Sequence, residues 1–175
     1  MLGIIEIGLV VLISRKMDRL SQKAALGYFI LYSALNGITL GSIFIVYTDK
    51  SVISVFLVAS AMFFCCSMIG MTAKRDLSVV GRIAIIGLVG ILITTLINMF
   101  IGSQETWSIL NYLGVIVFSA LTAYDMQKVK YMHQESYGMD PIMVNKLAII
   151  AALQLYLDFI NIFIYLIRIF GQEDR

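Results

Sequence analysis

Long uncharged apolar runs constrain this chain more than any other feature of its sequence. Residues 24–48 form a run of 25 residues without a charge, and about 20 apolar residues are enough to cross the hydrocarbon core of a bilayer as a helix. The chain of 175 residues is 60% hydrophobic and 14% charged, with a mean hydropathy of +0.92. Soluble domains are about 45–50% apolar and about 25% charged. The sequence therefore predicts an integral membrane protein.

The pattern of these runs favours helices over a β-barrel. The apolar runs are long and unbroken, whereas barrel strands alternate between apolar and polar residues. The single proline, Pro141, lies in a polar segment between two runs. We therefore predict one all-α membrane domain, residues 1–175, with six visible spanning helices at about 1–14, 24–48, 52–73, 77–101, 107–125 and 147–170.

Basic residues are distributed unevenly among the connecting loops. Four Lys or Arg lie in residues 15–23, three in residues 74–82 and three in residues 128–146, whereas the alternate loops hold only Lys50. Loops rich in Lys and Arg face the cytoplasm in most membrane proteins. We therefore expect the basic loops to be cytoplasmic and the C-terminus to lie on the outer side. The short basic loops fit the cell (inner) membrane of a bacterium.

The last apolar run carries a polar stripe. Gln154, Asp158, Asn161, Tyr165 and Arg168 follow one another at steps of four, three, four and three, which places them on one face of a helix. A charged side chain facing lipid costs about 2.5–3.5 kcal/mol on insertion scales. This stripe should therefore face other helices, so we predict that the C-terminal helix is central and enclosed by the others. Gln154 and Asn161, about one turn from Asp158, are its expected hydrogen-bond supports.

Ionisable residues inside the spans are the first candidates for function. Glu6 lies in the first run and is either a pore-lining acid or an interfacial residue. Arg168 lies near the outer end of the last run, where a long basic side chain reaches the headgroups more readily than it serves a site. Asp125 and Asp158 remain as the pair of greatest interest.

Asp125 and Asp158 have the chemistry of a pH sensor if their helices bring them together. Two neighbouring carboxyls at low dielectric share one proton, and the ionised pair admits a cation such as calcium, which prefers oxygen ligands. The alternative is that Asp125 is a surface acid paired with Lys128. Depth favours the alternative, because Asp158 lies about 16 Å beyond Leu147 and Asp125 is expected near the inner surface. The two meet only if the helices tilt or if the last helix starts deeper in the membrane than assumed here.

Enzyme signatures are absent from the sequence. The single histidine, His133, lies in a loop, which excludes a Ser–His or Cys–His nucleophile within the membrane. The sequence contains no HExxH, phosphate-binding or dinucleotide-binding pattern. Tyr124–Asp125 matches one signature of intramembrane aspartyl proteases, but Leu157–Asp158 does not match the other. We therefore expect no enzyme activity, no cofactor and no nucleic-acid partner.

Four segments resemble the transmembrane Bax inhibitor motif family, in its bacterial type. They are TAYDMQKVK at 122–130, ALQLYLDFINIFIYLIRIFG at 152–171, NGITLG at 36–41 and KRDLSVVG at 74–81. The resemblance extends over essentially the whole chain, and LYLDFIN combined with AYD is its most specific part. It implies seven helices with the last one enclosed by the other six. The first helix of the family has no counterpart in this sequence, which begins within the second.

The resemblance also implies a function and its residues. It implies a pH-sensitive calcium leak across the membrane, with Asp125 and Asp158 as the sensor and as tentative calcium ligands. Glu6 matches an acid that lines the pore, and either Arg15 or Arg19 matches an arginine that latches the sensor.

Two other functions stay open at this point. Members of the family also act as regulatory binding proteins of a membrane protease or of stress and cell-death machinery, and a proton-coupled transporter would use the same acidic pair. The expected partners are the lipid bilayer, calcium and protons, with a membrane protein as a further candidate.

Overall fold

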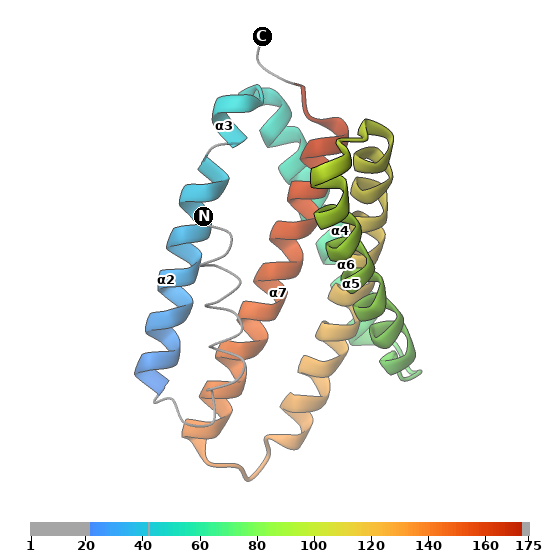
Figure 1. The fold of residues 1–175 in the computed structure, drawn as a ribbon. Helices are drawn as coiled ribbons and strands as arrows, with labels where there is room; N and C mark the ends of the chain where they lie inside the picture. The colour runs from blue at the N-terminus through green and yellow to red at the C-terminus, as the bar shows by residue number, and fades with distance from the viewer. Residues whose placement is uncertain (1–21, 42, 173–175) are drawn as a thin grey trace.

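The computed structural model describes residues 22–41 and 43–172, and every regular element in them is a helix (Figure 1). The elements are α2 (Gln22–Gly41), α3 (Ile43–Val46), α4 (Asp49–Thr72), α5 (Ser78–Ile101), α6 (Gln104–Glu135) and α7 (Pro141–Phe170). The predicted all-α class is confirmed. The predicted helix at 1–14, with Glu6, Arg15 and Arg19, lies outside the described residues.

Four of the described helices, α4, α5, α6 and α7, are long and apolar enough to cross a membrane. Four of the six expected spans are therefore present in the described residues. The run at 24–48 was predicted as one helix, but α2 ends at Gly41 and a short α3 follows at Ile43–Val46. This segment contains Gly27, Gly37 and Gly41, and glycine is less favourable in a helix interior than other residues except proline.

The hairpin between α6 and α7 differs from the sequence expectation. Residues 126–146 were expected to form the longest loop, yet α6 continues to Glu135 and α7 already begins at Pro141. Much of the polar composition of this segment belongs to exposed helix surface, as at Lys128, Gln134 and Glu135. The earlier start of α7 is capped, because the Asp140 side chain accepts a hydrogen bond of 2.9 Å from the Ile142 N–H and Pro141 occupies the first turn.

Helices α6 and α7 share the centre of the bundle. Helix α6 packs against α4, α5 and α7, while α7 packs against α6, α4 and α2 (Figure 1). The predicted enclosure of α7 by all the other helices is therefore only partly present in the described residues, because α5 packs mainly on α6. The apolar core joins α4, α5, α6 and α7 through Val52, Val55, Ala59, Ala84, Phe118, Leu121, Ile162, Phe163, Leu166 and Ile167.

Two glycines bring α4 and α5 against α6. A Cβ on Gly70 of α4 would overlap the carbonyl oxygen of Ala123, and a Cβ on Gly81 of α5 would lie 2.6 Å from the ring of Tyr124. Any side chain at either position would force the helices apart. The absence of a side chain therefore permits the close packing on this side of α6.

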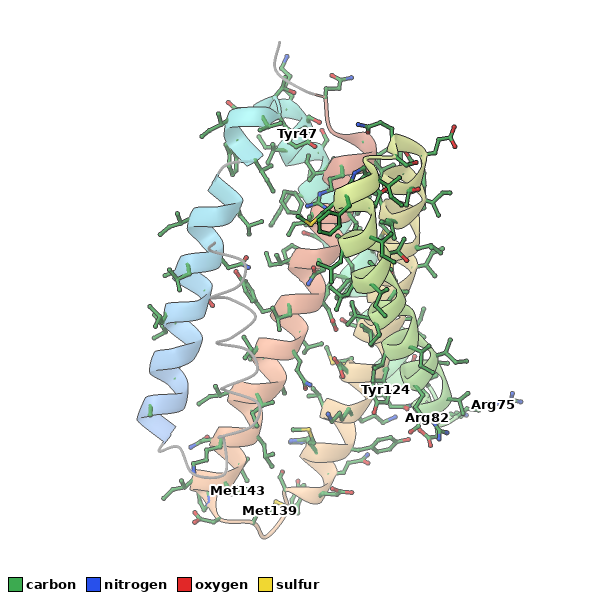
Figure 2. All side chains as sticks on the ribbon, in the orientation of Figure 1. Tyr47, Arg75, Arg82, Tyr124, Met139 and Met143 are labelled. Carbon is green, nitrogen blue, oxygen red and sulfur yellow. The ribbon has the colours of Figure 1, made fainter. Side chains whose placement is uncertain are left out.

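The described basic loops lie at one end of the bundle. The α4–α5 loop and the α6–α7 hairpin share this end, whereas the C-terminus lies at the opposite end (Figure 1). Arg75, Arg82, Met139 and Met143 mark the first end and Tyr47 marks the other (Figure 2). This arrangement agrees with the alternation of basic loops in the sequence, and their orientation toward the cytoplasm stays a prediction.

Candidate functional site

Asp158 is the polar group whose burial most needs explaining. Its side chain is 4% exposed and lies well inside the membrane-spanning helix α7. Within residues 22–41 and 43–172, its Oδ2 atom has no hydrogen-bond partner. Buried polar groups are almost always hydrogen-bonded, and leaving one without a partner costs about 1–3 kcal/mol. A carboxyl in this state marks a candidate site.

The helices that carry the two candidate acids are packed by aromatic rings and by a buried hydroxyl. Phe159, which follows Asp158 on α7, makes edge contacts with Phe56 and Phe63 of α4, at centroid distances of 5.5 and 5.6 Å. On α6, the fully buried Thr122 donates its hydroxyl to the Phe118 carbonyl at 2.8 Å, within its own helix. The residue after Asp158 therefore packs α7 on α4 through aromatic rings.

Asp125 approaches this site from α6. Its carboxyl is the charged group that acts electrostatically on Asp158, and Lys128, one turn further along α6, acts on Asp125. No hydrogen bond joins the two carboxyls in the described part of the chain. The structure thus brings the two predicted residues near each other from different helices, with Lys128 beside Asp125. The structure therefore contains both neighbours that the sequence left open for Asp125, namely Asp158 on α7 and Lys128 on α6.

The depth objection to this pair depended on a wrong helix boundary. Asp125 was expected at the inner end of its helix, but α6 continues to Glu135. The earlier start of α7 at Pro141 adds about 9 Å to the distance of Asp158 from the start of its helix, but the extension of α6 adds about 15 Å on the side of Asp125, so the difference in depth becomes smaller. Both carboxyls therefore lie inside long helices, which is how Asp125 comes within electrostatic range of Asp158.

The two expected supports of Asp158 do not reach it in this structure. Asn161 instead donates from Nδ2 to the Leu157 carbonyl at 2.7 Å, one turn back in α7. Gln154 is half-buried, and no hydrogen bond of the described residues links it to Asp158. The short reach of an asparagine favours its own helix backbone over a neighbour one turn away.

The C-terminal half of the polar stripe has a packing role. The Tyr165 ring stacks on Phe118 at 5.8 Å and covers Gly114, where any Cβ would lie 2.6 Å from the ring. The Arg168 side chain is exposed, with its guanidinium carbon 5.9 Å from the centre of the Tyr165 ring. This placement agrees with the expectation that Arg168 reaches outward.

One residue close to the site was missed by the sequence analysis. Gln127 on α6 is 1% exposed; its Oε1 accepts from the Leu77 N–H at 2.8 Å and its Nε2 donates to the Arg75 carbonyl at 2.9 Å. It was overlooked because the segment after Asp125 was read as loop. The three-residue spacing of the apolar residues Met126, Val129 and Met132 is the signal that would have extended the helix.

Comparisons with known proteins agree with the fold and the motifs. The model of the family described as "Inhibitor of apoptosis-promoting Bax1" matches residues 1–175. The chain is 45% identical to the inner membrane protein YbhL of Escherichia coli (strain K12) over 170 residues, which cover 97% of this chain and 73% of YbhL.

Other relatives lie further from the chain. It is 42% identical to an uncharacterized protein of Borreliella burgdorferi over 170 residues, 97% of this chain and 73% of that protein. It is 40% identical to an uncharacterized membrane protein of Streptococcus pyogenes serotype M1 over 172 residues, 98% of this chain and 73% of that protein. With the family model matched along its whole length, this chain belongs to the Bax inhibitor family of membrane proteins.

Proposed function

We propose that this protein is a pH-sensitive channel that lets calcium leak across a bacterial inner membrane, with Asp125 and Asp158 as its sensor and gate. One observation carries the proposal. Asp158 is a carboxyl buried within a membrane span, and its Oδ2 has no partner among the described residues. Burying this carboxyl and holding it near the second acid, Asp125, both cost stability, which favours a functional reason for the arrangement.

Electrostatics connect this arrangement to gating. When one proton is present on the pair, the neutral carboxyl can stay in a buried site and hold α6 and α7 together. When both carboxyls ionise, they repel each other, and a cation between them relieves the repulsion. The site is therefore expected to be closed at lower pH and open to cations at higher pH.

Calcium suits this pair as a passing ion. In the described residues no cluster of three or more His, Cys, Asp and Glu side chains is present. A bound calcium ion usually takes six to eight oxygen ligands. Two carboxylates supplemented by water and carbonyl oxygens would hold the ion weakly, which favours transit over storage.

Calcium flux into liposomes tests the proposal. The purified protein should admit calcium faster in mildly alkaline than in mildly acidic buffer, measured with a trapped calcium dye. The double variant Asp125→Asn with Asp158→Asn should lose this pH dependence. Asp49→Asn, an exposed acid at the start of α4, is the matched control and should keep it.

The outcomes separate the rival functions. Flux with unchanged pH dependence in the double variant refutes the sensor. If no variant and no parent protein carries calcium, a regulatory binding role becomes the better description, and a partner should then co-purify with the double variant as well. Calcium flux that requires counterflow of a second substrate would indicate a transporter instead.

A further inference from the structure

A buried amide holds the α4–α5 loop against α6 close to Asp125. The Gln127 side chain uses both of its ends, accepting from the Leu77 N–H and donating to the Arg75 carbonyl. Both hydrogen bonds go to backbone groups of the loop that joins α4 and α5. The Lys130 ammonium adds a longer contact of 3.4 Å to the Ala73 carbonyl in the same loop. One face of α6 is therefore tied to this loop.

The helix next to Asp125 is held from two further directions. Ala123 abuts Gly70 of α4, and Tyr124 covers Gly81 of α5 (Figure 2 marks Tyr124). These contacts and the Gln127 bonds fall within five consecutive residues of α6, with Asp125 between them. Interiors packed this closely resist small displacements, because each shift produces overlap or an empty space.

Because α6 is a continuous helix, the contacts at Gln127 also restrict the position of Asp125. Successive residues of an α-helix are rotated by about 100° and rise about 1.5 Å. Asp125 and Gln127 therefore point to nearly opposite sides of α6, at levels about 3 Å apart. A rotation or slide of α6 that moves the Asp125 carboxyl also pulls Gln127 away from the loop. The two hydrogen bonds of Gln127 must then break.

The contact between α6 and α7 is less complete at the same end of the bundle. A cavity of about 140 Å³ lies there, and it is lined from α6 by Val129, Met132, His133 and Ser136 and from α7 by Val144, Leu147, Ala148 and Ala151. No comparable clamp joins α7 to α6 at this level in the described residues. Helix α7 thus borders a cavity at this end of the bundle, whereas α4, α5 and their loop pack directly on α6.

We infer that Gln127 is a positioning residue that fixes the Asp125 carboxyl in place, so that Asp158 on α7 is the member of the pair that moves. This inference rests on the proposed function, because it assigns unequal roles to the two acids of the proposed sensor. It adds a residue outside the acidic pair and predicts which helix moves when the pair ionises.

The other charged groups near Asp125 set the background for this role. Asp158 approaches from α7 and Lys128 lies on α6 itself. The α4–α5 loop and the first turns of α5 carry further charged groups, which are Lys74, Arg75, Asp76 and Arg82. Helix α4 contributes the half-buried Cys66 thiol, and its charged residues Asp49 and Lys50 lie in its first turn, at the other end of that helix. A substitution of Gln127 removes none of these charged groups.

Replacement of the amide by a thioether of similar shape tests the inference. Gln127→Met keeps the length of the side chain and removes both hydrogen bonds, whereas Gln134→Met makes the same exchange at an exposed position of α6. The first readout is the pH midpoint of calcium flux in liposomes, which a purely structural role would not move. We expect Gln127→Met to shift the midpoint by about 0.5 pH unit or more, and Gln134→Met to leave it unchanged.

A second readout does not depend on conduction. Spin labels at Lys74→Cys and Tyr131→Cys, in a background with Cys65 and Cys66 replaced by alanine, report the distance between the loop and α6. The distance distribution should be narrow with Gln127 and broad with Gln127→Met. If Gln127→Met fails to fold, Gln127→Asn replaces it, because its amide is one methylene too short to span both backbone groups.

The results distinguish the inference from the proposed function. A shifted midpoint with a broadened distribution supports the inference. An unchanged midpoint in a folded, pH-sensitive Gln127→Met protein overturns it. If the parent protein carries no calcium, the proposed function fails, and the distance measurement decides alone: a broadened distribution still supports the clamp on α6, whereas an unchanged distribution overturns it.

Discussion

The two sides of α6 differ in how they treat buried polar groups. Toward α4 and α5, Gln127 is 1% exposed and has partners at both ends of its amide. Toward α7, Asp158 is 4% exposed and its Oδ2 has no partner in the described chain. The glycines Gly70 and Gly81 allow close packing on the first side, while a cavity of about 140 Å³ lies on the second side, next to the α6–α7 hairpin.

This difference distinguishes a buried polar residue that stabilises the bundle from one that marks a candidate site. A satisfied hydrogen bond contributes about 0.5–1.5 kcal/mol, whereas an unsatisfied buried group costs about 1–3 kcal/mol. Gln127 therefore strengthens the bundle and Asp158 weakens it. A polar residue inside a span does not by itself identify a site; the absence of a partner does so more reliably.

A side chain at Gly70 should produce the largest effect on stability. In Gly70→Val the new atoms would overlap the Ala123 carbonyl, so α4 must move away from α6. Overpacking of this kind costs about 1–3 kcal/mol or more. The melting temperature in detergent should fall sharply. Gly90→Ala is the control, since a Cβ there meets nothing within 4 Å, and an unchanged melting temperature in Gly70→Val would show that this side of α6 is not tight.

Removal of the unpartnered carboxyl should act in the opposite direction. Asp158→Leu replaces a buried group without a partner by an apolar one, so we expect a gain of about 1–2 kcal/mol in unfolding free energy. Flux should lose its pH dependence in the same variant. Asp140→Leu makes the same exchange at the partnered cap of α7 and should lose about 0.5–2 kcal/mol. Equal losses in the two variants would contradict the contrast between them.

Filling the cavity between α6 and α7 is a smaller change, and it tests the packing on the α7 side of α6. Ala151→Val adds apolar volume to its wall, whereas Ala152→Val adds it at an exposed position of the same helix. We expect a gain of about 0.5–1.5 kcal/mol for the first variant and a slower flux if α7 must move there. A destabilised Ala151→Val protein with unaltered flux would show that the cavity is not free space for α7.

The helical class, the long apolar runs and the position of Asp158 on a buried stripe were all accessible from the sequence. These features depend on period and hydropathy within single helices, which local sequence carries.

The end of α6 and the role of Gln127 were not predicted. The spacing of Met126, Val129 and Met132 carries the helix signal, but the polar residues among them were read as a loop. The partners of Gln127 lie in the α4–α5 loop, far away in the sequence, so no local pattern shows them. Gln154 and Asn161 were also expected to form hydrogen bonds to Asp158, and the structure contains neither bond among the described residues. Only the fold distinguishes an asparagine bonded to its own helix from a carboxyl without a partner.

The smallest expected effect lies in the α4–α5 loop, beside the clamp. The Ser78 hydroxyl and N–H donate to Asp76 Oδ1 at 2.6 and 2.9 Å, and these hydrogen bonds lower the pKa of the Asp76 carboxyl. A lowered pKa in the folded protein means that the stabilisation is present above the ordinary pKa of aspartate and is lost as the pH falls through the lowered value.

Asp76→Ala should therefore melt slightly below the parent protein at neutral pH and converge with it in strong acid. Asp76→Asn keeps an acceptor oxygen for Ser78 and should fall between the two. Melting curves recorded over a pH series measure this difference. Because Asp76 is exposed and stands outside the contact of α6 with Gln127, its loss should leave the pH midpoint of flux unchanged. A shifted midpoint would show that the loop acts on Asp125 through its charges as well as through the amide clamp.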